Sequence, residues 1–164
     1  MEIVLVEPEI PGNTGNIARL CAANHMSLHL VKPLGFSLDS KYLKRAGLDY
    51  WHLLDLHIHE SFEEVLAAYA DRRFFYATTK AKHTYAEVSC QYGDMLVFGK
   101  ETKGLPEELL AANYESTIRI PMIDAARSLN LSNSVAIIAY EGMRQLGFPD
   151  MKQLGALTSV NVVK

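Results

Sequence analysis

Two hydrophobic patterns alternate along this chain. Short apolar runs rich in β-branched and aromatic residues, typical of strands buried on both faces of a sheet, are separated by longer segments with helical periodicity. This alternation predicts βα units and therefore an α/β domain, with a mostly parallel sheet and helices on both faces. The predicted strands are residues 3–6, 28–31, 56–58, 74–78, 95–98 and 117–120, and the predicted helices are residues 13–26, 40–46, 62–70, 107–112 and 132–146.

Short polar side chains mark where several of these helices begin. Ser61 and Glu64 form an S-x-x-E capping box in front of the third predicted helix. Asn13 or Thr14 is the expected N-cap of the first helix, and Ser132 is the expected N-cap of the last, because their side-chain oxygens can accept backbone N–H groups.

Length and composition describe an ordinary globular protein. The 164 residues are 49% apolar and 21% charged, which predicts one domain over residues 1–150 followed by a tail at 151–164. Two cysteines are too few for a disulfide framework, and the apolar runs are far shorter than the ~18 residues of a membrane span. The chain begins at once with a predicted strand and lacks the features of a signal segment. We therefore expect a soluble, cytoplasmic protein.

Most common chemistries leave no motif in this sequence. Gly12 and Gly15 give GxxG, whereas dinucleotide-binding folds use GxGxxG. His57 and His59 share a strand face, but no third ligand stands nearby, so we expect no metal site. Neither cysteine stands in a pattern that would activate a thiol nucleophile, and we expect both to be packing residues.

Three polar loops, each following a predicted strand, stand out instead. The first is PEIPGNTGN at residues 8–16, followed by Arg19 on the next helix. The second is FGKETKGLP at residues 98–106, in which two glycines would let the backbone approach a ligand closely. The third, at residues 118–133, contains IRIPM and SLNLSN. Helix capping and turn formation explain some of the polar residues in each loop. They do not explain Arg19 or the additional polar side chain of Ser128.

In this order and spacing the loops resemble the motifs of the SPOUT-class RNA methyltransferases. The resemblance extends to Phe148 and is greatest to the small members that consist of the catalytic domain alone, which methylate the ribose 2′-hydroxyl of the tRNA wobble nucleotide, cytidine or modified uridine. Gly12, where a second proline would be expected, and the tail depart from the pattern. The matching segments are PEIPGNTGNIARLCAAN, KRAG with LDY, ATTK, LVFGKETKGLPEELL, IRIPM and SLNLSNSVAIIAYE.

The resemblance implies a fold, a cofactor and partners. The fold would be SPOUT-type with a deep C-terminal trefoil knot, which composition and periodicity would never suggest. The cofactor would be S-adenosyl-L-methionine, the substrate tRNA through its anticodon stem-loop, and the site would be completed by the second subunit of a homodimer. The strand ends suit an adenine ring, because backbone groups there can bind its edge. The cofactor contacts implied are Ala77, Thr78, Gly99, Gly104, Ile120, Met122, Ser128 and Leu129.

For the chemistry the resemblance points to Arg19, with Ser128 and Asn130. A guanidinium stays protonated in proteins, so Arg19 is a poor base. We expect it to orient a phosphate that accepts or relays the proton of the ribose hydroxyl. Ser128 and Asn130 would bind the ribose or the carboxylate of the cofactor. Methyl transfer from a sulfonium needs alignment of the reacting atoms more than it needs a metal.

A formal charge of −3 argues against bulk attraction to RNA, so RNA binding would need a local basic patch. Basic residues do gather near the three loops. They are Lys41, Lys44, Arg45, Lys80, Lys82, Lys100, Lys103 and Arg127.

The last predicted helix has two apolar stripes, although a helix that covers only its own core needs one. We therefore predict a homodimer with Tyr140 in or beside the interface; a central helix flanked by its own chain is the alternative. The first stripe is Val135, Ile138, Ala139 and Leu146, and the second is Ala136, Tyr140 and Met143.

Two other functions stay open at this point. A non-catalytic nucleotide-binding module would use the glycine loops without needing Arg19. A SPOUT enzyme could instead act on ribosomal RNA or on a base nitrogen. The sequence contains no additional RNA-binding domain, which favours the small anticodon target.

Overall fold

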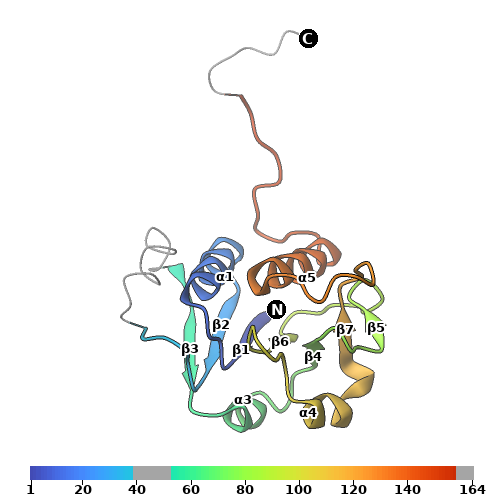
Figure 1. Cartoon of the computed structure of the whole chain (residues 1–164). Helices are drawn as coiled ribbons and strands as arrows, with labels where there is room; N and C mark the ends of the chain where they lie inside the picture. Colours follow the sequence, from blue (N-terminus) through green and yellow to red (C-terminus); the bar gives the residue numbers. More distant parts are fainter. Residues whose placement is uncertain (39–52, 158–164) are drawn as a thin grey trace.

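The structure, a computed structural model, describes residues 1–38 and 53–157. Within these residues the strands form one sheet in the order β3-β2-β1-β6-β4-β7-β5, and every pairing is parallel (Figure 1). The predicted α/β class with a parallel sheet is confirmed. The strands are β1 (Glu2–Val6), β2 (Ser27–Val31), β3 (Leu56–His59), β4 (Phe74–Ala77), β5 (His83–Thr84), β6 (Met95–Phe98) and β7 (Thr117–Arg119).

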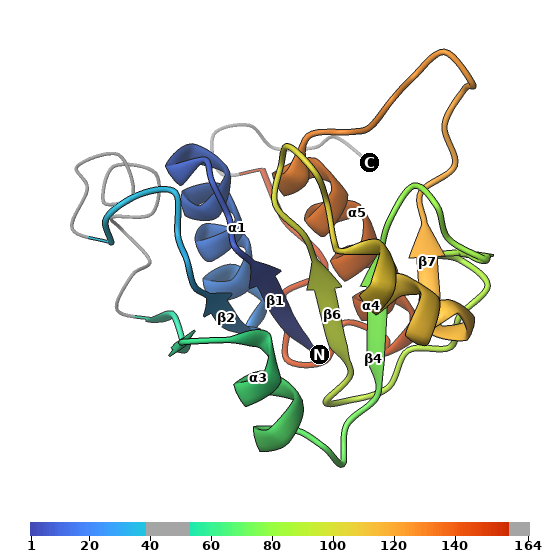
Figure 2. The same ribbon diagram turned by 60° about the horizontal axis from the view of Figure 1, so that its bottom comes forward.

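Helices cover both faces of the sheet, as the pattern predicts. The long helices α1 (Pro11–Asn24) and α5 (Leu131–Gln145) lie side by side on one face, and the short helices α3 (Phe62–Ala68) and α4 (Glu107–Ala112) lie on the other (Figures 1 and 2). Alternate residues of the central strands pack into the two apolar cores on the two faces of the sheet, because successive side chains of a strand point to opposite faces. In β1, Ile3 and Leu5 join the core beneath α1 and α5, and Val4 and Val6 join the other core.

The strand order explains where a ligand site can form. From β1 the chain moves outward through β2 to β3, and it then crosses to β4 on the far side of β6. Open α/β sheets bind ligands outside the carboxyl ends of the strands, near such a reversal. The loops that follow β4, β6 and β7 leave the sheet at this edge (Figure 2).

The predicted N-caps of the two long helices are wrong. Helix α1 begins at Pro11, with Ile10 in the cap position and no side-chain cap, so Asn13 and Thr14 lie inside the first turn. In α5 the cap is Asn130, whose side chain accepts backbone N–H groups of residues 132 and 133. The predicted box at α3 is confirmed in part. The Ser61 hydroxyl accepts the Glu64 N–H at 3.4 Å, but the Glu64 carboxylate binds the N–H of residue 60 and not that of Ser61.

Other boundaries shift by one or two residues. Helix α1 ends at Asn24 because His25 adopts a left-handed conformation, and α3 ends two residues earlier than predicted. The short strand β5 and a 3₁₀ turn at Tyr114–Ser116 (η2) have too few residues to show a periodicity. The helix predicted at 40–46 lies outside the described residues. After α5, residues 149–157 have no helix or strand. Met151 still packs against the core, and the chain beyond Gln153 runs away from the body (Figure 1). The trefoil knot stays a prediction.

Candidate active site

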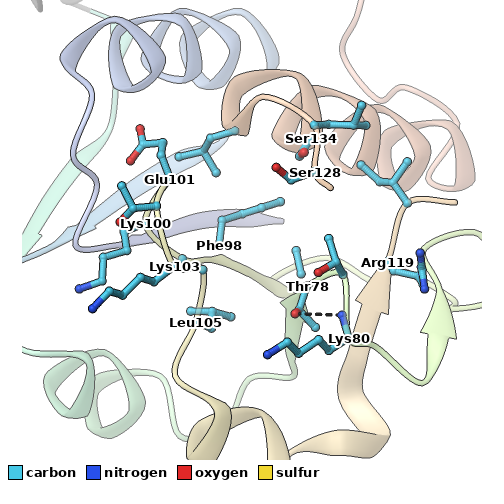
Figure 3. A pocket seen from close by; sticks show the side chains of 18 of the residues that line it. Thr78, Lys80, Phe98, Lys100, Glu101, Lys103, Leu105, Arg119, Ser128 and Ser134 are labelled. Atoms are coloured by element: carbon cyan, nitrogen blue, oxygen red, sulfur yellow. Dashed lines mark hydrogen bonds between the residues drawn. The ribbon is translucent and has the colours of Figure 1, made fainter. Parts of the chain in front are cut away.

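A cavity of about 930 Å³ opens at the carboxyl ends of three neighbouring strands. Ala77 and Thr78 line it from the end of β4, Phe98 and Gly99 from the end of β6, and Ile120 from the segment after β7. The loop at 99–105 and the segment that leads into α5 form the remaining walls (Figure 3).

The structure brings together all eight residues predicted to hold the cofactor. Each of them lines this cavity, as does Asn130. Arg19 does not line it, and Asn13 is the one lining residue from α1. Arg19 lies two turns further along that helix, on its exposed side. The loops are thus joined in one site, and the predicted catalytic arginine stands outside that site within one chain. The eight residues are Ala77, Thr78, Gly99, Gly104, Ile120, Met122, Ser128 and Leu129.

The two glycines of the second loop are required for different reasons. A Cβ on Gly99 would lie 2.1 Å from the carbonyl carbon of Gly104, since the loop folds back against its own start. The backbone N–H of Gly104 donates to the Lys100 carbonyl at 2.8 Å and closes this turn. Gly104 itself has a φ of +69°, a left-handed conformation that L side chains rarely adopt. Our expectation that Gly99 is small to make room for a ligand is therefore incomplete, because the loop's own backbone already fills the space.

The first and second loops are joined by two carboxylates. Glu101 accepts the backbone N–H groups of Glu9 and Ile10, at 2.8 and 3.2 Å. In return, the Glu9 carboxylate accepts both the N–H and the hydroxyl of Thr102, each at 3.0 Å. A carboxylate at a helix N-terminus also interacts favourably with the helix dipole. Glu101 thereby supplies the polar partner that no residue of α1 itself provides at its start.

Asn13 extends this connection to the third loop. Its amide donates to Glu101 Oε1 at 3.0 Å, and its side-chain oxygen accepts from Asn130 Nδ2 at 2.9 Å. The oxygen of Asn130 accepts the N–H and the hydroxyl of Ser132, at 2.9 and 2.7 Å. The Asn130 amide is therefore largely used in capping α5 and in binding Asn13. A direct contact between Asn130 and substrate stays a prediction.

The mouth of the cavity is basic but partly neutralised. Lys80 is paired with Glu107, and Lys100 is paired with Glu7. The hydrogen bond that Lys100 donates to Glu7 raises the pKa of Lys100, so this lysine stays protonated. Of the predicted patch, Lys82 lies outside the cavity, and residues 41, 44 and 45 lie outside the described residues. The basic residues that line the cavity are Lys80, Lys100, Lys103, Arg119 and Arg127.

The remaining expectations concern metals, thiols and membranes. In the described ranges, no group of three or more His, Cys, Asp or Glu side chains is arranged to hold a metal ion. Burial raises the pKa of the Cys21 thiol to about 12, so this side chain is a protonated core residue, as predicted. None of the helices in the described part of the chain is long and apolar enough to cross a membrane.

Comparison with known proteins decides the family. The model of the SpoU rRNA methylase family matches residues 1–140. The chain belongs to this family. It is 53% identical over 148 residues to the tRNA (cytidine(34)-2′-O)-methyltransferase of Methylovorus glucosotrophus, an alignment that covers 90% of this chain and 96% of that protein. The enzyme of the same name from Escherichia coli K12 is 49% identical over 150 residues, covering 91% and 96%.

Solved structures of SpoU methylases agree with this assignment. A structure that concerns 2′-OH methylation of C/U34 on tRNA matches with a TM-score of 0.85 at 48% identity, over 89% of this chain and 95% of that one. The AdoMet-bound rRNA methyltransferase of Sinorhizobium meliloti matches with a TM-score of 0.77 at 26% identity, over 88% and 56%. The predicted methyltransferase family and its cofactor, S-adenosylmethionine, are confirmed.

The cavity fits this cofactor. Its volume lies within the range of about 300–1,000 Å³ usual for small-molecule sites. The backbone at Ala77, Gly99 and Ile120 offers donors and acceptors at three adjacent strand ends, while Leu105 and Leu129 supply apolar surface. Both kinds of contact are what a flat, polar-edged adenine ring requires.

Sequence reasoning missed the structural role of two residues at this site. Glu101 was treated as part of a polar turn, and Asn13 as a helix cap. The sequence held one weak signal of these contacts. Two carboxylates, Glu9 and Glu101, lie in loops that would otherwise be suited to bind a phosphate. Nothing in a single sequence indicates that Glu101 reaches the backbone of a residue 92 positions away.

Proposed function

We propose that this SpoU methylase transfers a methyl group from S-adenosylmethionine to the ribose 2′-hydroxyl of the tRNA wobble nucleotide, position 34. The observation that supports this most strongly is the joining of three motif loops around one cavity at the strand ends. The identity of 53% and 49% to enzymes named for this reaction, each over at least 90% of the chain, supports the substrate.

The cofactor supplies a methyl group on a sulfonium, which is already bound to an excellent leaving group. The chain must bind and orient it. Backbone at Ala77, Gly99 and Ile120 would hold the adenine, with Thr78, Gly104, Met122 and Leu129 around it. Ser128, which is exposed in the cavity wall, would hydrogen-bond the ribose of the substrate or the polar end of the cofactor.

The attacking hydroxyl must lose a proton as it reacts. Arg19 would bind the neighbouring RNA phosphate through a bidentate pair of hydrogen bonds, and the phosphate would take up or relay that proton. Alignment of the hydroxyl with the methyl group supplies much of the rate, since a correctly placed pair of reactants avoids the entropic cost of meeting. Lys103 and Arg127 at the cavity mouth would contact further phosphates.

We further propose that the site is shared in a homodimer. Arg19 lies on the exposed side of α1 and outside its own chain's cavity, so a second chain would present Arg19 to it. The α5 surface supports this. Ile137 and Tyr140 are exposed to 36% and 46% on one side of the helix. The predicted second stripe is wrong in one member, since Met143 is buried in the chain's own core. The stripe beneath α5 is confirmed for Val135, Ile138 and Ala139.

Mapping of methyl groups in cellular tRNA tests the function. In a strain that lacks this protein, we expect 2′-O-methylation to disappear from nucleotide 34 of at least one tRNA and to return with the wild-type gene. Return with an Arg19→Ala gene, or loss only from ribosomal RNA or from a base nitrogen, would contradict the proposal. A cytoplasmic location would follow from this substrate.

A further inference from the structure

Three histidines form a cluster on the sheet face opposite α1 and α5, remote from the methyltransferase cavity. His29 of β2 is fully buried, while His57 and His59 stand on the neighbouring edge strand β3. The His29 ring stacks on His57 at a centroid distance of 4.7 Å and on His59 at 5.3 Å. The sequence pattern places only His57 and His59 on one strand face, and the structure adds the buried ring of His29.

Hydrogen bonds connect this imidazole cluster (His29, His57 and His59) to a carboxylate at the start of the chain. His29 Nε2 lies 2.8 Å from Glu2 Oε2, and His29 Nδ1 lies 3.0 Å from His59 Nε2. A nitrogen facing a carboxylate has to bear a hydrogen, so Nε2 of His29 donates to Glu2. The other nitrogen of His29 is then free to accept from His59 or, when protonated, to donate to it.

The hydrogen bond between His29 and His59 persists when one of the two rings is cationic but not when both are. If His29 and His59 were both cationic, every ring nitrogen would bear hydrogen, and two N–H groups would face each other across 3.0 Å. The hydrogen bond would be replaced by repulsion between like charges in a buried place.

The other charged and polar groups around the cluster do not remove this conflict. Asp55 pairs with His57 at 3.1 Å and also binds the Ser27 hydroxyl. From α3 and the turn after it, Tyr69 presents its ring edge to His29, and Glu64 and Arg72 act at longer range on His59 and Glu2. No group among these accepts a hydrogen bond from the face that His59 turns toward His29.

We infer that the His29–His59 pair of the imidazole cluster is an acid-sensitive latch. It holds the edge strand β3 on β2 while at most one of the two rings is cationic, and it releases β3 when both rings are cationic. Because β3 pairs only with β2 in the described sheet, the His29–His59 contact acts on the exposed end of that sheet. The inference does not depend on the proposed function.

The direction of the pH effect follows from the shift at His59. Burial and the neighbouring His29 and His57 lower the pKa of His59 in the folded protein below its ordinary value of 6.5. The unfolded or detached strand therefore binds the proton more readily, so stability of the paired strand falls as pH decreases below about 6.5. The pKa of Glu2 is lowered mainly by its hydrogen bond from His29, and this contribution is lost only in more acidic solution, below the ordinary carboxyl range.

Hydrogen exchange of backbone amides at pH 7.5 and pH 5.5, expressed as protection factors, tests the latch. We expect protection of Leu56–His59 to fall more than protection of Met95–Phe98, because two cationic rings cannot keep the His29–His59 hydrogen bond. In His59→Gln, whose side-chain amide can still donate to His29 but cannot gain a proton, the extra fall should vanish. His25→Asn removes a histidine outside the cluster and tolerates the left-handed backbone there, so it should behave as wild type.

Equal loss of protection in β3 and β6, or an undiminished fall in His59→Gln, would overturn the inference. NMR titration of the wild-type ring signals gives a second test that needs no variant. The His59 ring should take up its proton below its ordinary midpoint of pH 6.5, and titration of His59 at that ordinary midpoint would also overturn the inference.

Discussion

Asn130 Nδ2 donates a hydrogen bond of 2.9 Å to Asn13 Oδ1, although the two residues are 117 positions apart in the sequence. The same Asn13 side chain donates to Glu101, so three motif loops are connected through one buried amide. This connection fixes the start of α1 relative to the start of α5. The geometry of the cavity between them therefore depends on polar contacts as well as on the apolar core.

Replacement of Glu101 tests this connection. In Glu101→Gln one carboxylate oxygen becomes an amide group that cannot accept, although the site presents three donors. We expect a loss of about 1–3 kcal/mol in the free energy of unfolding, with weaker cofactor binding. Glu108→Gln on the exposed surface of α4 is the matched control and should change stability by no more than about 0.5 kcal/mol. Urea denaturation at one protein concentration measures the free energy of unfolding of both variants. Equal values for Glu101→Gln and Glu108→Gln would contradict the role assigned to Glu101.

Substitution at Gly99 tests whether the loop at 99–105 shapes the cofactor site. Because a Cβ there would lie 2.1 Å from the Gly104 backbone, even Gly99→Ala should displace the loop at 99–105. We expect cofactor affinity, measured by calorimetry with S-adenosylhomocysteine, to fall by about tenfold or more, equivalent to about 1.4 kcal/mol. Secondary structure should persist, since Leu105 is the one residue of this loop that belongs to the apolar core.

Two other glycines calibrate that result. Gly104→Ala meets no atom within 4 Å but must adopt a φ of +69°, so its effect should be smaller than that of Gly99→Ala. Gly155→Ala, with open space around it, should have no effect. Unchanged affinity in Gly99→Ala would show that the loop does not shape the cofactor site.

The fold was predictable from the sequence to a large extent, and the reason is physical. Buried strands such as β1 and β6 have continuous apolar runs, and α5 repeats apolar residues with helical spacing, so local sequence contains the information. Helix starts that use distant partners could not be predicted. The N-terminus of α1 is bound by Glu101, which follows a different strand, so local capping residues at Asn13 and Thr14 were misleading.

The site was predictable only in its membership. The loops could be recognised, and the structure places Thr78, Gly99 and Ser128 around one cavity. The roles within the loops could not be predicted, because Gly99 accommodates its own loop and Asn130 caps a helix. Likewise, the buried His29 became significant only once β2 and β3 were paired.

Replacement of Arg19 tests whether this residue acts in methyl transfer without contributing to cofactor binding. Arg19→Ala should bind S-adenosylhomocysteine with normal affinity, because Arg19 is proposed to hold an RNA phosphate and not the cofactor. We expect methylation of purified tRNA to fall by about 10²- to 10³-fold, the loss found when one charge-stabilising group is removed from an active site. Turnover close to wild type would remove Arg19 from the mechanism.

The dimer depends on the exposed side of α5. Tyr140→Asp would place a charge in the proposed apolar contact, and such a charge is costly to bury. We expect sedimentation velocity to show a dimer for the wild type at micromolar concentration and a monomer for this variant. Tyr92→Asp, at a tyrosine that is 68% exposed outside α5, is the control and should remain dimeric. A monomeric wild type that methylates tRNA would contradict the shared site.

Methylation of a tRNA with a single altered ribose tests the central claim most directly. The purified protein and S-adenosylmethionine are incubated with two substrate tRNAs that differ only at nucleotide 34, one with a ribose and the other with a 2′-deoxyribose. Mass spectrometry of nuclease fragments should show one added methyl group at nucleotide 34 of the first and none anywhere in the second. Equal methylation of both tRNAs would contradict the account, because the hydroxyl proposed to attack the methyl group is absent from the second.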